Sequence, residues 1–377
     1  MTDQKGNILD KIIKSEEEQK KTELNPQELV SFLLSDLNPR EKEVISARYG
    51  LDREKGETLE AIGKRYSITR ERVRQIENNA LKKALATKDV EEKLKDLIAL
   101  VTRYIHQGGY IRLEDHLLDE LLASRQEAEI DRNCLKFVFN KFLNNHIEPI
   151  DIVHTDRAWK VRDRDISHFN KIVAKVKNIF SQKNKALKLS ELKKEFAGQE
   201  HDEDMRKVLD ELEDFEGALE SYLHTSKHFK KNLFDQWGLM EWRTVNPKRM
   251  RDKIYLILLK DKEPLHYRKI AERINQEEFD SKRAHPATIH NELILDDRFV
   301  LIGRGIYALQ DWGYKPGVIS EVVRDVLKQA GAPLTREEIT KEVLKQRKVK
   351  EGSINLTLSD KNNFVRLADG RYTLNQS

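Results

Sequence analysis

The sequence has a single cysteine, Cys134, and no long hydrophobic run. One cysteine excludes an intrachain disulfide framework and any zinc site built from several thiolates. Cys134 lies in the apolar run CLKFVFNKFL, which predicts a buried structural thiol and no nucleophile. No run approaches the ~18 apolar residues of a membrane span, and the N-terminal residues lack the apolar core of a signal peptide. These absences predict a soluble, cytoplasmic protein.

Recognisable catalytic and metal-binding motifs are also missing. The sequence contains no Walker loop, no HExxH, no GxSxG and no cysteine–histidine ligand set. Its eleven histidines are scattered, and His224 and His228 share helical spacing without a third ligand nearby. We therefore predict that the protein is not an enzyme and uses neither a metal ion nor a cofactor.

Charged residues are abundant, at 36% of the chain against 38% hydrophobic residues. That balance favours several small domains over one large core, because a large domain must bury more apolar surface. The net charge is only +4, so the local distribution of charge has to decide whether the chain binds nucleic acid.

The hydrophobic periodicity predicts a mainly α chain with five folded parts after a polar, flexible arm at 1–24. A helical domain at 25–88 includes a helix that begins at Pro39 and ends at Gly50. Beyond it we predict four winged-helix-like α+β units with the order helix, helix, helix, strand, strand. Their ranges are 89–164, 165–247, 248–314 and 315–377.

Each of these units has a recognisable opening helix, second helix and closing strand. The opening helices are predicted near residues 91, 167, 249 and 316. The second helices fall within 110–121, 186–196, 264–274 and 333–344, and the closing strands within 156–163, 239–245, 303–312 and 369–376. Gly303, Gly305 and Gly370 suit tight turns between strands. The second unit is the least regular, because 213–238 shows no clear period.

The run TLEAIGKRYSITRERVRQIENNALKKAL at 58–85 predicts two short helices joined by a tight bend. On the second helix, apolar residues share one face and polar residues the opposite face, with Arg70 at its edge. Arginine can bind guanine, glutamine can pair with adenine, and glutamate can accept from cytosine. Seven Lys/Arg and two Glu lie between Lys64 and Lys83. The outward residues are Glu71, Arg74, Gln75, Asn78 and Lys82.

Together with LNPREKEVISARYGL at 37–51, this run resembles region four of the sigma-70 family of RNA polymerase sigma factors. The resemblance implies a helix-turn-helix that binds the minus-35 promoter element in double-stranded DNA. By position, Arg70, Glu71 and Gln75 would face base edges, and Arg74 bases or phosphate. Thr58, Leu59 and Lys64 would approach the DNA backbone, and 39–49 would dock on the β flap of the polymerase core.

The 36 residues before this segment are too few for the other sigma domains, so we do not expect a self-sufficient initiation factor. A second stretch, 249–314, resembles the HARE-HTH winged helix through PLHYRKIAERI, ATIHNEL and RFVLIGRGIYALQDWG. Its candidate phosphate contacts are Lys269, Arg273, Lys282 and Arg283.

Three functional hypotheses remain open at this point. The first is a sequence-specific DNA-binding transcription regulator whose winged-helix units add DNA or protein contacts. The second is a polymerase-associated protein that docks on the β flap without reading bases, and the third is an accessory of DNA modification or restriction. The polar outer face of the second helix favours the first, because a copy that binds only protein needs no base-reading side chains.

Overall fold

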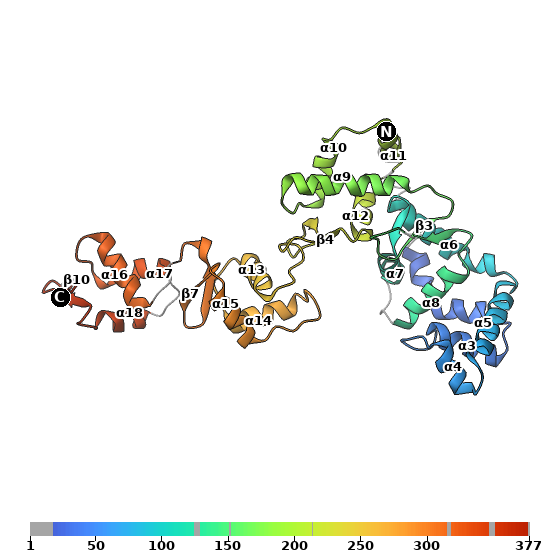
Figure 1. The fold of residues 1–377 in the computed structure, drawn as a ribbon, viewed down its shortest axis with the longest axis horizontal. Coiled ribbons are helices and arrows are strands. Elements are labelled where there is room, and N and C mark those ends of the chain that lie inside the picture. Colours follow the sequence, from blue (N-terminus) through green and yellow to red (C-terminus); the bar gives the residue numbers. More distant parts are fainter. Residues whose placement is uncertain are drawn as a thin grey trace. The chain divides into compact units, whose positions relative to one another are not determined.

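The computed structural model describes residues 18–123, 129–150, 152–212, 214–314, 318–346 and 351–375 (Figure 1). The chain divides into two compact units, 1–229 and 230–377. It is mainly helical with small antiparallel sheets, as the sequence predicted. Of the arm predicted at 1–24, residues 1–17 lie outside the described residues, whereas 18–23 are helical and Lys20 forms an ion pair of 2.9 Å with Asp96.

The first unit begins with short helices whose ends follow from local sequence. Asn25 and Asn38 each cap a helix with proline at its first position, and Asn38 forms a capping box with Glu41. The second of these helices ends before Gly50, as predicted. The four helices are α2 (Pro26–Leu33), α3 (Pro39–Tyr49), α4 (Leu59–Tyr66) and α5 (Arg70–Leu85).

Residues 89–164 form three helices and a three-stranded antiparallel sheet with the order β1-β3-β2. The first strand directly precedes the second helix, and the last two strands follow the third helix. The elements are α6 (Val90–Gln107), β1 (Ile111–Leu113), α7 (Glu114–Leu122), α8 (Glu129–Lys141), β2 (Ile147–Pro149) and β3 (Ala158–Val161).

Residues 165–247 depart from the expected pattern in two places. A helix lies in the stretch without clear period, and the strand predicted at 239–245 is wrong beyond Leu239. Turn hydrogen bonds from Trp242 N to Leu239 O and from Val245 N to Trp242 O replace it. The elements are α9 (Ser167–Lys183), α10 (Leu189–Ala197), α11 (Glu203–Glu211), α12 (Phe215–Thr225), β4 (Phe229–Lys231) and β5 (Trp237–Leu239).

Residues 248–314 repeat the arrangement of 89–164, with the sheet order β6-β8-β7. Gly305 has a φ of +69° in the turn between the last two strands, and a Cβ there would lie 2.8 Å from His266 Nε2. The elements are α13 (Met250–Asp261), β6 (Leu265–His266), α14 (Tyr267–Gln276), α15 (Pro286–Leu295), β7 (Phe299–Gly303) and β8 (Ile306–Leu309), followed by a short 3-10 helix at Gln310–Trp312.

Residues 315–377 have the same order of helices as 248–314. A bridge between Leu334 and Tyr372 takes the place of the first strand. Its opening helix begins at Ile319, and Pro316 and Gly317 lie outside the described residues. That these units are winged helices stays a prediction. The elements are α16 (Ile319–Ala330), α17 (Arg336–Gln346), α18 (Glu351–Leu358), β9 (Phe364–Arg366) and β10 (Tyr372–Leu374).

The main hydrophobic core of the first unit runs without interruption across residue 88. Leucines of α2 share this core with α6, α7, α8 and Trp159 of β3. Helix α8 packs on both α2 and α3. Gln27 Nε2 donates to Asp131 Oδ1 at 2.8 Å, and the rings of Tyr49 and Phe137 lie 4.8 Å apart. We therefore no longer expect residues 25–88 to fold independently.

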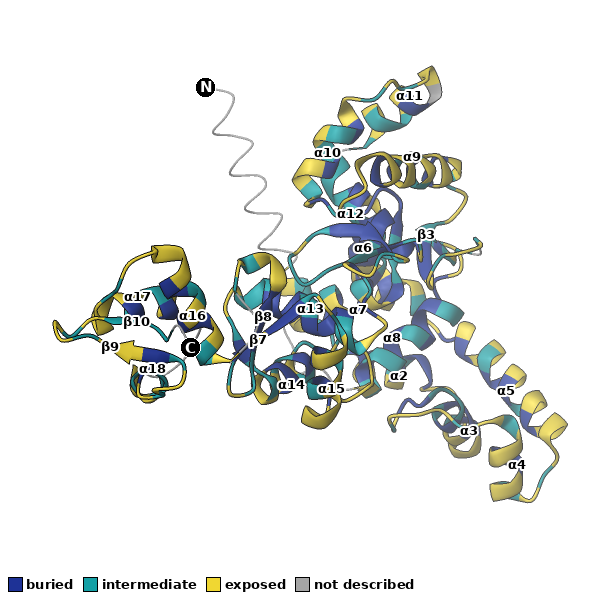
Figure 2. Cartoon of the chain, turned by 60° about the vertical axis from the view of Figure 1, so that its left-hand side comes forward, coloured by how far each residue is buried: buried dark blue, intermediate teal, exposed yellow. Residues whose placement is uncertain are grey.

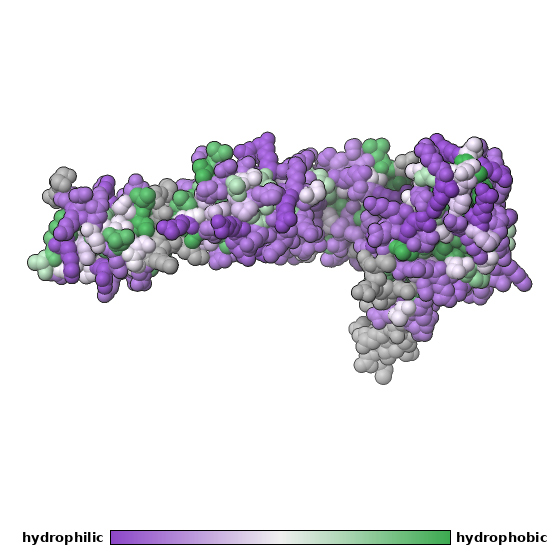
Figure 3. Space-filling model, turned by 90° about the horizontal axis from the view of Figure 1, so that it is seen from below, coloured by the Kyte–Doolittle hydropathy of each residue, from purple (hydrophilic) through white to green (hydrophobic). Residues whose placement is uncertain are grey.

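Cys134 is fully buried in this shared core, which confirms the predicted structural thiol. Burial raises the pKa of the thiol to about 12, so it stays protonated near neutral pH. Figure 2 shows that buried residues line the inside of each unit, and Figure 3 shows a largely hydrophilic surface with small, separate hydrophobic areas. Within the described ranges, we find no helix that combines the length and apolarity needed to cross a bilayer.

Candidate nucleic-acid interface

Helices α3, α4 and α5 enclose a small core of their own. Val44, Ala47, Ile62 and Val73 are completely buried between them. Half-buried side chains around this cluster extend it to the helix ends, namely Leu59, Tyr66, Ile68 and Ile76. The apolar faces of α4 and α5 are thus buried in this core, and the opposite faces of the two helices point to solvent.

The bend between α4 and α5 depends on a close approach at Gly63. A Cβ at this position would lie 2.8 Å from the carbonyl oxygen of Ile68, which is closer than real Cβ atoms come. Ser67 then ends α4 in the left-handed conformation, with a φ of 54°. The sequence G-K-R-Y-S-I therefore produces the compact helix-turn-helix that was predicted at 58–85.

Threonine caps the N-terminus of both helices. The Thr58 hydroxyl accepts from Ala61 N at 3.2 Å, and that of Thr69 accepts from Arg72 N at 3.1 Å. Each cap leaves other backbone N–H groups of the first turn available, at the end of a helix that attracts anions. Thr58 is exposed beside this end of α4, whereas Leu59 is half-buried in the core and serves packing.

All the predicted base-reading residues lie exposed on the outer side of α5, and two neighbouring pairs restrain them. The guanidinium of Arg74 donates to both carboxylate oxygens of Glu71, at 2.9 and 2.7 Å. Arg72 Nη1 donates to Gln75 Oε1 at 3.1 Å. The hydrogen bonds from Arg74 lower the pKa of Glu71, so its carboxylate stays ionised. The exposed set is Arg70, Glu71, Arg74, Gln75, Asn78 and Lys82.

Sequence reasoning left out further exposed residues of the same helix, among them Arg72 and Asn79. Both flank the outer face at helical spacing, so a full helical projection of 70–85 would have included them. Lys64 of α4 is exposed as predicted and forms an ion pair of 2.9 Å with Glu60, four residues before it.

The inner side of α5 is anchored to α3 by two buried carboxylates. The Tyr49 hydroxyl donates to Glu77 Oε1 at 2.7 Å, and Arg48 lies 3.8 Å from the same oxygen. Lys83 Nζ lies 2.6 Å from Glu41 Oε1. This hydrogen bond from Lys83 lowers the pKa of Glu41. Both anchors fix the rotation of α5 about its axis, and with it the direction of the outer face.

Helix α3, the predicted contact with the β flap, has little free surface. Val44 and Ala47 pack toward α4 and α5, whereas Ile45 and Tyr49 pack toward α2 and α8. Asn133 of α8 covers the end of α3 by donating to Gly50 O at 3.3 Å and to Glu54 O at 3.0 Å. The exposed residues of α3 are Pro39, Arg40 and Glu43.

In the second candidate set, in the other unit, two of the four side chains are paired with carboxylates. Arg273 is held by Asp261, whose two carboxylate oxygens lie 3.0 and 2.7 Å from its guanidinium nitrogens. Lys269 lies 3.3 Å from Glu272 on the same helix. Lys282 and Arg283 are exposed in the loop before α15, and their role as phosphate contacts stays a prediction.

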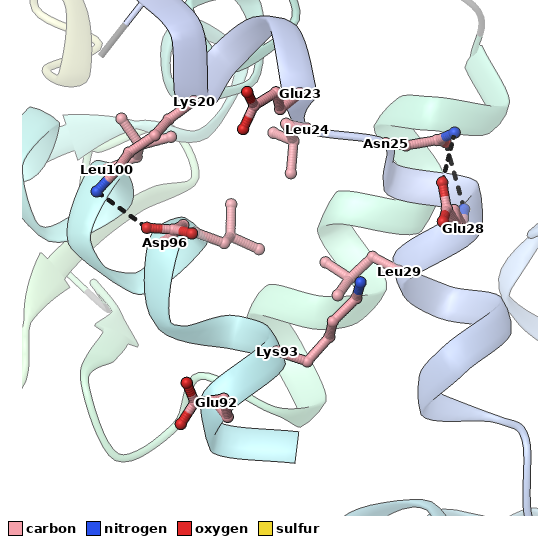
Figure 4. A pocket seen from close by; sticks show the side chains of 11 residues that line it. Lys20, Glu23, Leu24, Asn25, Glu28, Leu29, Glu92, Lys93, Asp96 and Leu100 are labelled. Atoms are coloured by element: carbon pink, nitrogen blue, oxygen red, sulfur yellow. Dashed lines mark hydrogen bonds and ion pairs between the residues drawn. The ribbon is translucent and has the colours of Figure 1, made fainter. Parts of the chain in front are cut away.

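A pocket of about 300 Å³ lies between residues 20–29 and α6 (Figure 4). Carboxylates of Glu23, Glu28, Glu92 and Asp96 line it together with the amines of Lys20 and Lys93. The ion pair between Lys20 and Asp96 uses one of these carboxylates. No group of three or more ligand-type side chains within the described parts of the chain could hold a metal ion.

The comparisons with known proteins concern the same helices. Residues 33–83 match the family model "Sigma-70, region 4". The RNA polymerase sigma factor SigA of Clostridium acetobutylicum is 47% identical over 66 residues, which are 18% of this chain and 17% of that protein. SigA1 of Synechococcus elongatus is 55% identical over 51 residues, 14% of this chain and 13% of SigA1.

The sigma factor RpoD of Helicobacter pylori is 56% identical over 55 residues, 14% of this chain and 8% of RpoD. The chain thus spans less than a fifth of the length of each of these relatives. The HARE-HTH resemblance of 249–314 stays a prediction. Residues 33–83 are therefore similar to sigma-70 region 4, which confirms the resemblance predicted for 37–85.

Proposed function

We propose that this chain is a non-catalytic transcription regulator that binds duplex DNA through α4 and α5. The observation that carries the proposal is the outer face of α5, which lies within the residues that match region 4. The polar residues of this face are exposed, while buried contacts on the opposite side of α5 hold the helix on α3. A segment that served only to bind protein would need no such face. Action on promoters places the chain in the cytoplasm, with the DNA.

In the proposed complex, α5 enters the major groove with its N-terminal turns against base edges. Arg70 donates to guanine and Gln75 pairs with adenine, since these side chains match the hydrogen-bonding pattern of those bases. Asn78 and Lys82, one and two turns further along, reach the flanking bases or phosphates. The N-terminus of α4 at Thr58 and the amine of Lys64 bind the sugar-phosphate backbone, which sets the register.

The pair formed by Glu71 and Arg74 orients both side chains on α5 before DNA binds. Glu71 is ionised, so it can accept from the amino group of cytosine, while Arg74 holds the carboxylate in place and neutralises it near phosphate. Arg72 donates to the oxygen of the Gln75 amide, and a hydrogen bond from Gln75 also lowers the pKa of Glu71, so neighbours on α5 orient the amide of Gln75.

Titration of full-length protein against two duplexes of equal length tests the proposal. One contains a minus-35-like hexamer and the other a scrambled sequence. We expect Arg70→Ala and Gln75→Ala to cost about 1–3 kcal/mol on the first duplex and much less on the second. Lys64→Ala should weaken binding to both equally, and Lys95→Ala, on an exposed part of α6, should change neither. Equal losses on both duplexes for all variants would contradict base reading.

Docking on the polymerase β flap through 39–49 is the second candidate function. The exposed Arg40 and Glu43 offer only a narrow polar strip, because α5 and α8 cover the apolar faces of α3. If the flap binds here, Arg40→Glu should abolish retention of polymerase core on immobilised protein without changing DNA affinity. Undiminished retention would exclude this strip as the docking site.

A further inference from the structure

A long acid-free stretch surrounds α9. Between Ile166 and Ser190 the sequence has six lysines and no aspartate or glutamate, although the chain as a whole has 65 acidic residues. The excess per residue is similar to that around α5, but there two glutamates lie among the seven basic residues, whereas this stretch has no acidic residue. The stretch therefore creates a positive potential that neighbouring acids on the same helix do not cancel.

The structure places much of this charge on one exposed face. Phe169, Ile172, Val176, Ile179 and Phe180 are buried on the inner side of α9. The opposite side is exposed along the length of the helix (Figure 2). Small and amide side chains form its middle line, with Lys171 on one flank and Lys177 on the other. The middle line consists of Ser167, Asn170, Ala174, Asn178 and Ser181.

Of the acidic residues near α9, Asp165 accepts from the backbone N–H and the hydroxyl of Ser167 at the start of the middle line, and Glu195 pairs with Lys183 at the other end of the helix. Lys183 lies 2.6 Å from Glu195 of α10, and Lys175 donates to the carbonyl of Glu200 and lies 2.9 Å from His201 Nδ1. Lys177 and Lys185 are exposed, and within the part of the chain that the structure describes neither forms an ion pair. Their charges are available to a ligand.

The third helices of the four tandem units are poor candidates for binding phosphates. Helix α8 has one exposed residue, Glu129, because α2 and α3 cover it. Helix α11 has four acidic and two basic residues, and α15 and α18 have neither lysine nor arginine. In contrast, α9 is the opening helix of its unit and combines lysines with neutral hydrogen-bonding groups.

We propose that the outer face of α9 is a second nucleic-acid site, which binds the phosphate backbone of duplex DNA without reading its sequence. Lys177 of α9 and Lys185, two residues beyond the end of the helix, bind phosphates, and Asn170 and Asn178 donate hydrogen bonds beside them. The 17 residues of α9 extend over about 25 Å, enough to contact several successive phosphates. The choice of DNA as the ligand rests on the proposed function of α5.

The test compares full-length protein with Lys177→Glu/Lys185→Glu on the hexamer duplex and the scrambled duplex, over a series of salt concentrations. We expect the affinity to fall about 10-fold or more on both duplexes, with an unchanged ratio between them. The slope of log affinity against log salt should decrease by about 1.8, since each phosphate contact contributes about 0.9. Lys177→Gln/Lys185→Gln should give the same change in slope with a smaller loss of affinity.

A matched control carries the same charge change elsewhere. Lys328 and Lys361 are exposed in the other unit, and Lys328→Glu/Lys361→Glu should leave the salt slope unchanged. Circular dichroism should show the same helix content for all variants, because the substituted side chains lie outside the core. If the α9 and control variants lose equal affinity, the effect is one of net charge and the site is refuted.

Two further probes separate other ligands from DNA. If the α9 variant binds both DNA duplexes like the parent but loses binding to duplex RNA or to polyglutamate, α9 serves RNA or an acidic protein and the proposal is wrong. If α5 does not recognise bases, the same measurements give a different result. In that case Arg70→Ala leaves the ratio between the two duplexes unchanged, while the α9 variant still lowers affinity for both.

Discussion

The hydroxyl of Tyr49 on α3 donates a hydrogen bond of 2.7 Å to the buried carboxylate of Glu77 on α5. Burial raises the pKa of Tyr49, and the hydrogen bond to Glu77 raises it further, so the hydroxyl stays protonated. This bond links α3, which packs in both cores of residues 18–163, to α5, which carries the proposed DNA-binding face. Its loss should therefore affect both stability and DNA binding.

We expect Tyr49→Phe to destabilise α5 by about 1–3 kcal/mol, because a buried carboxylate loses a donor. Amide hydrogen exchange of α3 and α5 measures this as a lower free energy of opening. Tyr104→Phe is the matched control, since the Tyr104 hydroxyl is buried with no hydrogen-bond partner among the described residues. Equal protection of α5 in Tyr49→Phe and the parent would show that the bond contributes nothing.

The contact between Glu41 and Lys83 predicts a dependence of stability on pH. Because the pKa of Glu41 in the folded chain lies below its ordinary value of 4.5, the ionised carboxylate stabilises the fold above that pH. This stabilisation is lost as the pH falls through the lower, folded pKa. We expect the stability of the parent to fall more steeply between about pH 5 and pH 3 than that of Glu41→Gln.

Urea unfolding followed by α5 hydrogen exchange at several pH values checks this expectation. Glu60→Gln serves as the control, because the Glu60–Lys64 pair lies on the surface, where such pairs contribute about 0–1 kcal/mol. Parallel pH profiles for the parent and Glu41→Gln would refute the role of Glu41.

The close approach at Gly63 makes this position intolerant of a side chain. We expect Gly63→Ala to destabilise the helix-turn-helix by about 1–3 kcal/mol, since the new methyl group forces α4 away from Ile68. Gly198→Ala, whose new Cβ would meet its nearest atom at 3.5 Å, should be neutral or slightly stabilising. Thermal unfolding of both variants separates the two effects, and equal melting curves would contradict the steric argument.

The shared core predicts how fragments behave. A fragment of residues 25–88 should unfold without a sharp transition, because it exposes the faces of α2 and α3 that α8 covers. A fragment of residues 18–163, which contains the whole of this core, should unfold cooperatively. Circular dichroism melts compare the two. A sharp transition of 25–88 at the temperature of the longer fragment would show that α8 is not needed.

The third helices α15 and α18 carry one glutamate each and no lysine or arginine, which predicts that residues 249–377 add little DNA affinity. Deletion of 249–377 should leave both the affinity and the salt slope on a long duplex unchanged, because α15 and α18 offer no cation to phosphate. If the deletion lowers the slope, Lys282 and Arg283 are the exposed residues to examine. Lys282→Ala/Arg283→Ala in the full chain should then reproduce the decrease.

The sequence by itself determined the local elements of this protein. Caps such as Asn38 and Thr69, helical apolar spacing and the G-K-R-Y-S-I bend act over a few residues, so the helix-turn-helix could be predicted from them, whereas the similarity to region 4 came from the resemblance to known sigma factors. The outer residues of α5 followed from the same spacing. The helix at 215–225 was missed because its short apolar pattern lies in an irregular stretch.

Only the tertiary structure decided which surfaces remain free. Contacts between distant residues, such as Gln27 with Asp131 or Tyr49 with Phe137, placed α8 over α2 and α3 and joined two predicted domains in one core. In the same way, Arg273 forms hydrogen bonds with Asp261, whereas the side chain of Lys177 stays exposed. Local sequence cannot encode these outcomes, because burial and charge pairing depend on side chains that meet only after the chain has folded.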